Sequence, residues 1–154
     1  MNTPKETLTL GWREWVGLPV LGIRQIKAKV DTGARTSALH AFKVRSFMEG
    51  NNERVEFQIH PIQKDNDTAI TCVADVLDKR VVTDSGGHKE ERFVISTDLA
   101  IGKHIWPIEV TLTARDDMLF RMLLGRTAIK NIAQVDPARS YLVGKKKRAA
   151  KDKK

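Results

Sequence analysis

The tripeptide Asp31-Thr32-Gly33 is the stretch best suited to chemistry, because it places a carboxylate directly after a strand-like run. In residues 26–30, apolar side chains alternate with Lys27 and Lys29, a period typical of a half-buried strand. Glycine allows the backbone to turn sharply, so the Gly33 N–H can face the carboxylate, and we expect Thr32 to point back into the structure. A strand that ends in an ordinary Asp-Gly-type turn would have the same residues, so the tripeptide alone leaves both interpretations open.

A second stretch far along the chain favours the chemical interpretation. Leu123 and Leu124 are followed by Gly125-Arg126 and by residues 127–131, which are predicted to be helical. In retropepsin-like aspartic proteases, an Asp-Thr-Gly loop lies beside a strand that ends in two apolar residues and glycine, and a helix follows. The two stretches of this chain are therefore expected to be neighbours in space.

Longer runs make the resemblance more specific. They are residues 29–41 (KVDTGARTSALHA), 111–116 (TLTARD), 120–126 (FRMLLGR) and 136–142 (DPARSYL). Together they resemble the bacterial retropepsin-like family that includes RimB, whose members are also labelled ATP-dependent zinc proteases. The resemblance covers nearly the whole chain except its ends, and it implies an all-β, retropepsin-like (acid protease) closed barrel with one short C-terminal helix.

The resemblance also implies roles for individual residues. Asp31, Thr32 and Gly33 would form the catalytic loop of an aspartic-type peptidase. Residues 123–126 would support this loop: they are Leu123, Leu124, Gly125 and Arg126. In the resembled fold the arginine after the glycine makes structural ion pairs, so we expect Arg126 to have a structural role, with an ordinary surface arginine as the alternative.

A single carboxylate cannot carry the mechanism, which needs two carboxylates that share one proton. The chain is too short for two lobes, so a homodimer with a two-fold axis is expected to bring two copies of Asp31 together. Asp84-Ser85-Gly86, with the apolar-glycine run 99–102 after it, resembles a second motif. The gap between those two runs is much shorter than in the first pair, so we interpret the match as coincidental and predict a hairpin tip here, which in such enzymes can be a mobile flap.

Arginines near the loop suggest an acidic substrate. Arg35 lies two residues after Gly33, and Arg92 and Arg115 are weaker candidates; a guanidinium can bind a carboxylate with two hydrogen bonds. An exposed arginine without a ligand is an equally open alternative. RimB-like proteins are associated with an ATP-grasp ligase that adds glutamates to the C-terminus of a small-subunit ribosomal protein, so the resemblance implies the opposing protease, which would remove or trim that poly-glutamate tail, with the glutamate ligase as a partner.

The sequence gives little support to the zinc and ATP of the family label. The candidate zinc ligands are His40, His60, Cys72, His88 and His104. They form no H-E-x-x-H or C-x-x-C motif, and the chain has no glycine-rich phosphate loop. We therefore expect no metal and no cofactor, and we expect Cys72 to be a core residue. A zinc peptidase remains one alternative, and a non-catalytic module that binds ribosomes, RNA or protein is another.

The charge is concentrated at one end of the chain. The 154 residues carry a net charge of +8, and seven of the 27 Lys/Arg residues lie in the last ten positions with one acid, which leaves 20 basic and 18 acidic residues before them. We predict one domain over residues 1–144 and a disordered basic tail over 145–154, which would aid solubility or contact RNA. A single cysteine and the lack of an apolar stretch of ~20 residues predict a cytoplasmic protein away from membranes.

Short strands at hairpin spacing are expected to position the loop. One strand is predicted over residues 8–16, another over 23–30, and one extended segment over 37–48. Residues 140–143 are predicted to form a last short strand. Helix is expected only at residues 127–131, so the elements agree with the all-β class.

Overall fold

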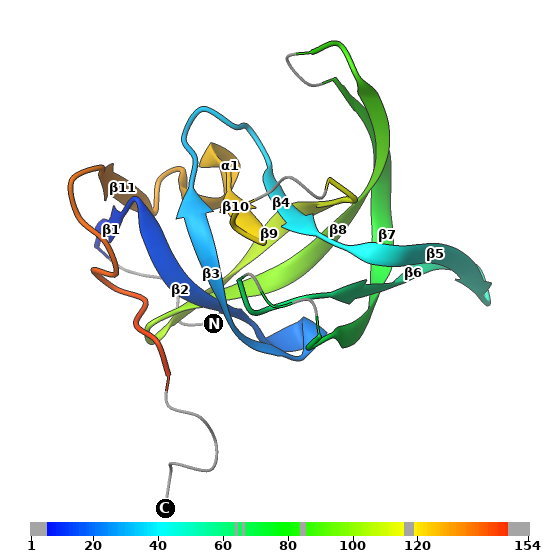
Figure 1. The fold of residues 1–154 in the computed structure, drawn as a ribbon, viewed down its shortest axis with the longest axis horizontal. Coiled ribbons are helices and arrows are strands. Elements are labelled where there is room, and N and C mark those ends of the chain that lie inside the picture. Colours follow the sequence, from blue (N-terminus) through cyan, green and yellow to red (C-terminus); the bar gives the residue numbers. More distant parts are fainter. Residues whose placement is uncertain (1–5, 64, 66, 84–85, 116–118, 148–154) are drawn as a thin grey trace, which may run out of the picture.

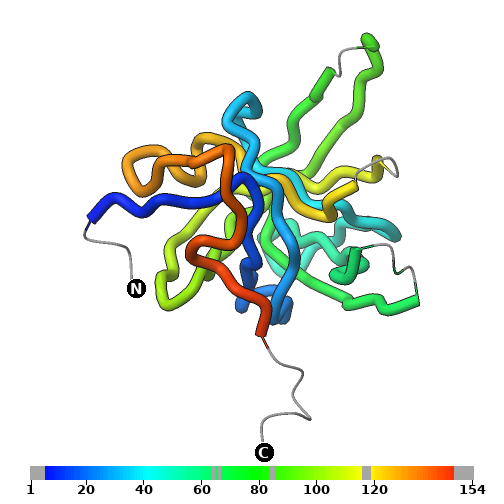
Figure 2. The backbone as a smooth tube through the Cα atoms, turned by 60° about the vertical axis from the view of Figure 1, so that its left-hand side comes forward, coloured from blue at the N-terminus to red at the C-terminus, as the bar shows by residue number. Residues whose placement is uncertain are grey.

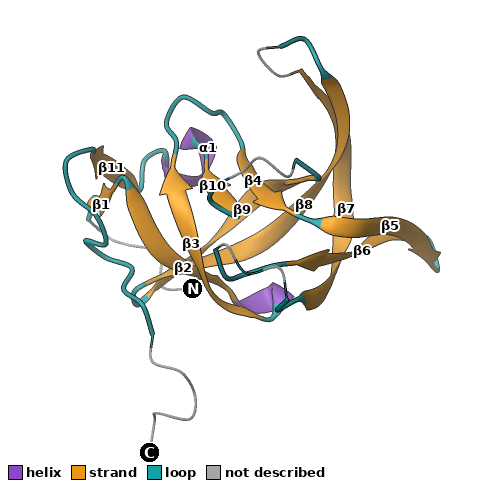
Figure 3. Cartoon of the chain, viewed as in Figure 1, coloured by secondary structure: helices purple, strands orange, loops and turns teal. Residues whose placement is uncertain are grey.

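The computed structural model describes residues 6–63, 65, 67–83, 86–115 and 119–147 (Figure 1). Strands dominate the described chain, with one short α-helix and one 3-10 turn (Figure 3). The elements are β1 (Leu8–Gly11), β2 (Arg13–Leu18), the 3-10 turn (Pro19–Leu21), β3 (Ile23–Val30), β4 (Ser37–His40), β5 (Phe42–Glu49), β6 (Asn52–Ile59), β7 (Ile70–Thr83), β8 (Lys89–Ile101), β9 (His104–Thr113), β10 (Met122–Leu124), α1 (Arg126–Ile129) and β11 (Ala133–Asp136). None of the helices in these ranges is long and apolar enough to span a membrane.

Nine strands form one sheet in the order β2-β3-β10-β4-β9-β8-β7-β6-β5, and β1 pairs in parallel with β11. Gly17 of β2 also pairs with Ala100 of β8, so the β2 end of the sheet curls back toward β8 while β7, β6 and β5 extend beyond it. The mostly-β class with one short helix agrees with the predicted all-β, retropepsin-like class. Closure of the sheet into a barrel stays a prediction.

Alternation along the strands builds the core. Ile26, Ala28 and Val30 of β3 are buried, whereas Lys29 is exposed. The same pattern on the other strands collects fully buried side chains such as Phe57 into one apolar cluster, and burial of this kind is the main driving force of folding. The strand that leads to Asp31 is thereby fixed on its inner face.

Two hairpins project from the body in different directions. The hairpin of β7 and β8 rises from the sheet, and that of β5 and β6 extends to one side (Figures 1 and 2). The β7–β8 tip lies where the sequence predicts a turn, and Gly87 has a positive φ of 84°. Asp84 and Ser85 lie outside the described residues. Leu99 is buried within β8, which turns into β9 through Gly102, so this run does not lie beside a second catalytic loop.

Three predicted strands differ from the structure. Residues 8–16 form two strands because the chain breaks at Trp12, whose N–H donates to the carbonyl of Arg139 (2.8 Å). Residues 37–48 divide at Ala41, whose N–H donates to the Thr113 carbonyl (2.9 Å). Residues 140–143 are not a strand, because some of their amides bind a side-chain carboxylate in place of a neighbouring strand. Of the predicted tail, the structure describes residues 145–147, which are exposed.

Candidate active site

The loop of residues 31–36 joins β3 to β4, and β10 lies between these two strands. In β10, Leu124 pairs in parallel with Val30 of β3, and Leu123 pairs in antiparallel fashion with Ala38 of β4. The first and second stretches of the sequence are therefore neighbours, as predicted. Because a strand inserted between the two ends of the loop holds both of them, the loop has a fixed place on the sheet.

Backbone hydrogen bonds join the loop to β10 and α1. The Asp31 N–H donates to the Leu124 carbonyl (2.8 Å), and the N–H groups of Arg126 and Thr127 donate to the carbonyls of Ala34 (2.9 Å) and Arg35 (3.0 Å). Each end of the loop is therefore paired with the chain that enters or leaves Gly125. This pairing gives a physical reason for the two stretches to occur together.

Gly125 is buried where β10 passes closest to the loop. A Cβ at this position would lie 2.5 Å from the carbonyl carbon of Thr36, a distance that no side chain could occupy. The Gly125 N–H donates to the buried Ser37 Oγ (3.0 Å), and the Ser37 carbonyl accepts a bond from Thr111 Oγ1 (3.2 Å). Sequence reasoning missed Ser37, although a hydroxyl that opens an otherwise apolar buried strand is a signal for such a role.

The Asp31 carboxylate is half-buried at the surface end of β3. Its Oδ1 accepts a hydrogen bond from the Gly33 N–H (3.1 Å), which is the arrangement expected from the sequence. Thr32 differs from expectation, because it is exposed and not turned into the structure. The backbone bonds to Leu124 and Arg126 already hold the loop, so its stiffness does not depend on an inward-pointing threonine.

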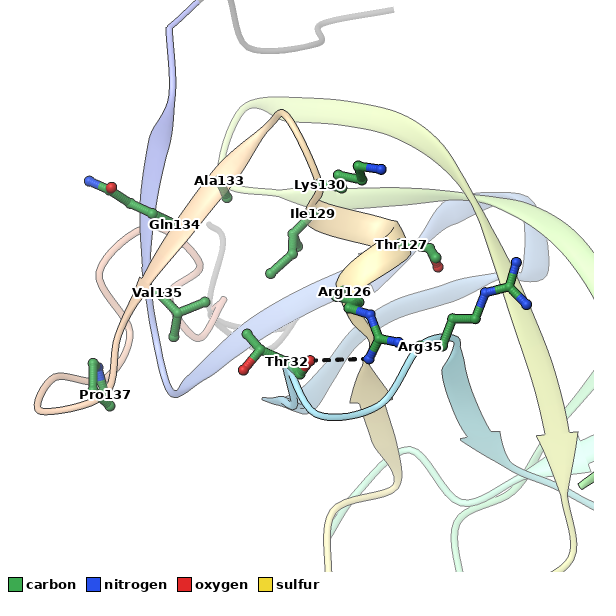
Figure 4. Close-up of a pocket in the computed structure, with 10 residues that line it drawn as sticks. All are labelled: Thr32, Arg35, Arg126, Thr127, Ile129, Lys130, Ala133, Gln134, Val135 and Pro137. Atoms are coloured by element: carbon green, nitrogen blue, oxygen red, sulfur yellow. Dashed lines mark hydrogen bonds between the residues drawn. The ribbon is translucent and has the colours of Figure 1, made fainter. Parts of the chain in front are cut away.

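Arg126 holds the outer side of the same loop. Its Nη1 donates to the carbonyls of Gly33 (3.1 Å) and Thr32 (3.5 Å) (Figure 4). The resemblance implied ion pairs, whereas in the described part of the chain this guanidinium donates to two carbonyl oxygens. These contacts are those of a residue that shapes the loop.

A pocket of about 700 Å³ lies beside the loop, between α1 and β11 (Figure 4). Three of its side chains are cations: Arg35, Arg126 and Lys130. The remaining lining residues are uncharged: they are Thr32, Thr127, Ile129, Ala133, Gln134, Val135 and Pro137. A concave site with charges of one sign attracts groups of the opposite sign, so this pocket suits an anionic group.

The three candidate substrate-binding arginines lie in different environments. Arg35 is exposed and lines both this pocket and a second one of about 420 Å³ that also contains Arg80 and Glu109. Arg92 is 11% exposed and forms an ion pair with Glu90 (2.5 Å), and it lines neither pocket. Arg115 follows β9 and also lines neither. Sequence reasoning missed Lys130, which lies beside the pocket because the chain turns there from α1 toward β11.

The candidate zinc ligands are spread over the fold. Within the described ranges, no three His, Cys, Asp or Glu side chains converge on one point. His60 stacks on Phe42 (4.2 Å between ring centroids) and its Nδ1 contacts the Thr68 carbonyl (3.0 Å). Cys72 is buried in β7, and desolvation raises the pKa of its thiol to about 11. A thiol with this pKa is protonated at neutral pH and is a weak nucleophile and ligand.

Relatives agree with the architecture of the loop and its strand. The family model described as "Retropepsin-like aspartic endopeptidase RimB" matches residues 9–146. A Legionella pneumophila protein of unknown function has a similar crystal structure, with a TM-score of 0.75 over 89% of this chain and 98% of that one, at 24% sequence identity. At this identity the similarity concerns the fold alone.

Two curated relatives have a different name. A protein from Desulfotalea psychrophila named "Probable alpha-L-glutamate ligase" is 45% identical over 135 residues, which make up 88% of this chain and 29% of that protein. A protein of the same name from Shewanella halifaxensis is 44% identical over 135 residues, or 88% of this chain and 30% of its own length. This chain thus spans less than a third of these relatives. Because the family model covers both the Asp31 loop and β10, the chain belongs to the RimB-like family of retropepsin-like aspartic endopeptidases.

Proposed function

We propose that the chain is an aspartic peptidase that acts as a homodimer, with one Asp31 from each copy at a shared site. The observation that carries this proposal is the geometry of the loop. Asp31 is held by β10 at the surface end of β3, and the neighbouring Thr32 and Gly33 are exposed. A second copy related by a two-fold axis can therefore approach this loop with its own.

In the proposed reaction, the two carboxylates share one proton because like charges so close together do not both ionise. The ionised carboxylate takes a proton from a water molecule, and the hydroxide formed adds to the carbonyl carbon of the peptide bond. The neutral carboxyl group gives its proton to the carbonyl oxygen. When the tetrahedral intermediate breaks down, a proton passes to the leaving amine and the carboxyl product is released.

We propose a glutamate-rich C-terminal extension, carried by a small-subunit ribosomal protein, as the substrate. Arg35 and the cationic pocket beside the loop support an acidic substrate, because each carboxylate of a glutamate run can form a charge-assisted hydrogen bond. The glutamate ligase name of the longer relatives supports a link to glutamate chemistry. A ligase would then add the residues that this chain removes.

The test uses a peptide that ends in several glutamates and a matched peptide that ends in glutamines, with products followed by mass spectrometry. The wild-type chain is expected to cleave the glutamate peptide, and Asp31→Asn is expected to lower the rate by about 10²–10⁴-fold because the amide cannot exchange the shared proton. Full activity of Asp31→Asn would contradict the assignment. Activity that a chelator removes and zinc restores would favour a zinc peptidase.

Dilution tests the requirement for two copies. Specific activity is expected to fall when the chain is diluted below the dissociation constant of its dimer, in parallel with the dimer fraction seen by analytical ultracentrifugation. A monomer whose specific activity is independent of concentration would contradict the paired-Asp31 site. Binding of the glutamate peptide without cleavage at any concentration would favour the non-catalytic module.

A further inference from the structure

The outward side of β2 and β3 carries an unusual set of side chains. In the antiparallel register, Arg13 lies opposite Lys29 and Trp15 lies opposite Lys27, and residues directly opposite each other point to the same side of a sheet. The alternate positions, such as Val16 and Ala28, are buried. We call the outward residues Arg13, Trp15, Lys27 and Lys29, with residues 139–147, the β2–β3 face.

Residues 139–147 extend this face along the other edge of β2. The Tyr141 N–H donates to the Arg13 carbonyl (2.9 Å), and the Trp15 N–H donates to the Gly144 carbonyl (3.2 Å). The Tyr141 ring stacks on Trp15 with 6.4 Å between centroids and an interplanar angle of 23°. Tyr141 has a φ of +55°, a strained conformation for a bulky residue, and such strain is concentrated at functional positions.

Cations and aromatic rings alternate across the β2–β3 face. The Arg13 guanidinium lies between the rings of Trp12 (4.6 Å) and Tyr141 (5.1 Å), whereas Lys27 (5.3 Å) and Lys146 (5.8 Å) lie over Trp15. Both Trp15 and Tyr141 are half-buried, so part of each ring remains in contact with solvent. The described part of this face has a mixed composition of rings and positive charges that suits a polyanion with flat bases.

The β2–β3 face contains no compensating acid among its described residues. Its defining positions on the two strands are Arg, Trp or Lys, and residues 139–147 read RSYLVGKKK. Lys29 and residues 145–147 are exposed. Arg13 opposite Lys29 is a like-charge pair, which by itself destabilises a sheet. A bound row of phosphates would remove this repulsion.

We propose that the β2–β3 face binds single-stranded RNA, with its lysines and arginines on the phosphates and the rings of Trp15 and Tyr141 stacked against bases. Stacking on aromatic side chains is how single strands are recognised, because their bases are free of a partner strand. The site lies away from the pocket between α1 and β11 and does not depend on the proposed peptidase activity. It would hold the enzyme at an RNA-containing particle while the Asp31 loop works on a protein tail.

The first test measures fluorescence anisotropy of labelled oligouridine with the full chain over a series of salt concentrations. Lys27→Ala/Lys29→Ala is compared with Lys89→Ala/Lys130→Ala, which removes the same charge from outside the β2–β3 face. Each lost phosphate contact lowers the salt slope for a single strand by about 0.7, so the face variant is expected to lose about 1.4 and at least tenfold in affinity. The control is expected to stay within about twofold, as one nonspecific contact more or less would give.

Equal effects of the two double variants, or no binding at low salt, would overturn the proposal. Binding of anionic vesicles or heparin as tightly as RNA, with the same dependence on Lys27 and Lys29, would overturn its RNA component and leave a general polyanion site. Photo-crosslinking with 4-thiouridine provides a measurement that needs no variant. Crosslinks are expected on peptides that contain Trp15 or Tyr141, and crosslinks confined to other peptides would contradict the proposal.

Discussion

Two carboxylates in this fold are bound by backbone amides to very different extents. Glu14 is fully buried, and its oxygens accept hydrogen bonds from the N–H groups of Gly11 (2.6 Å), Leu142 (2.9 Å), Val143 (3.0 Å) and Gly144 (2.6 Å). Asp31 is half-buried, and among the described residues the Gly33 N–H alone donates to it. A carboxylate whose lone pairs are all used holds a fold together, whereas one with free lone pairs can bind water or a proton.

The glycines around the two carboxylates show the same contrast. A Cβ at Gly144 would lie 1.9 Å from the Trp15 carbonyl oxygen, and one at Gly11 would lie 2.4 Å from the Arg139 carbonyl oxygen. A Cβ at Gly33 would meet its nearest atom, Asp31 Oδ1, at 3.3 Å. The Glu14 site is therefore closed by backbone on several sides, and the Asp31 site has room for a ligand.

The largest expected effect separates the two carboxylates by stability. Glu14→Gln is expected to lower the free energy of unfolding by about 3 kcal/mol or more, because hydrogen bonds to a charged acceptor are lost and buried amides are left unpaired. Asp31→Asn is expected to change it by less than about 0.5 kcal/mol. Urea denaturation measures both, and Glu56→Gln, in an exposed ion pair with Arg45, is the control for loss of a surface charge. A stable Glu14→Gln variant would contradict the structural role.

The glycines give the next largest effect. Gly125→Ala forces a methyl group against the Thr36 backbone, and overpacking of this kind costs about 1–3 kcal/mol. Gly33→Ala has more room and is expected to cost less than about 1 kcal/mol, while its methyl group disturbs Asp31 and lowers peptide cleavage. Thermal unfolding and cleavage rates on the same samples measure both quantities. If Gly33→Ala were the more destabilising of the two, the assignment of β10 as the tighter contact would be wrong.

The sequence predicts the Asp31 loop better than the Glu14 site for a physical reason. The loop's position follows from local patterns, namely an alternating strand, a glycine turn and an apolar strand with Gly125. Most donors to Glu14 come from residues 142–144, which lie far along the chain, and sequence periodicity does not show where such a segment returns. One signal was present: Glu14 alternates with Val16 and Leu18, so the strand pattern places it inward beside apolar residues.

The same distinction explains the other differences. The strand predicted over residues 8–16 breaks at Trp12 because residue 139 crosses there, a contact that is set by the tertiary fold. Lys130 reaches the pocket because α1 ends after one turn and the chain continues toward β11. Arg92 lies in an ion pair because its neighbour on the same side of β8 is Glu90, which the spacing of two residues in a strand could have indicated.

Cys72 extends the comparison to a buried group whose pKa is shifted by desolvation and not by hydrogen bonds. Burial raises the pKa of its thiol from 9.0 to about 11, so the unfolded chain releases this proton at a lower pH than the folded chain does. The stabilisation is complete below pH 9 and is lost as the pH rises from 9 toward 11, with a change of about 1 kcal/mol by pH 10. Urea unfolding of the wild type and of Cys72→Ala at several pH values measures this loss as the difference between their slopes. Equal slopes would mean that the thiol ionises as readily in the fold as in the unfolded chain, and burial alone would then not keep a group in this barrel-like sheet from reacting.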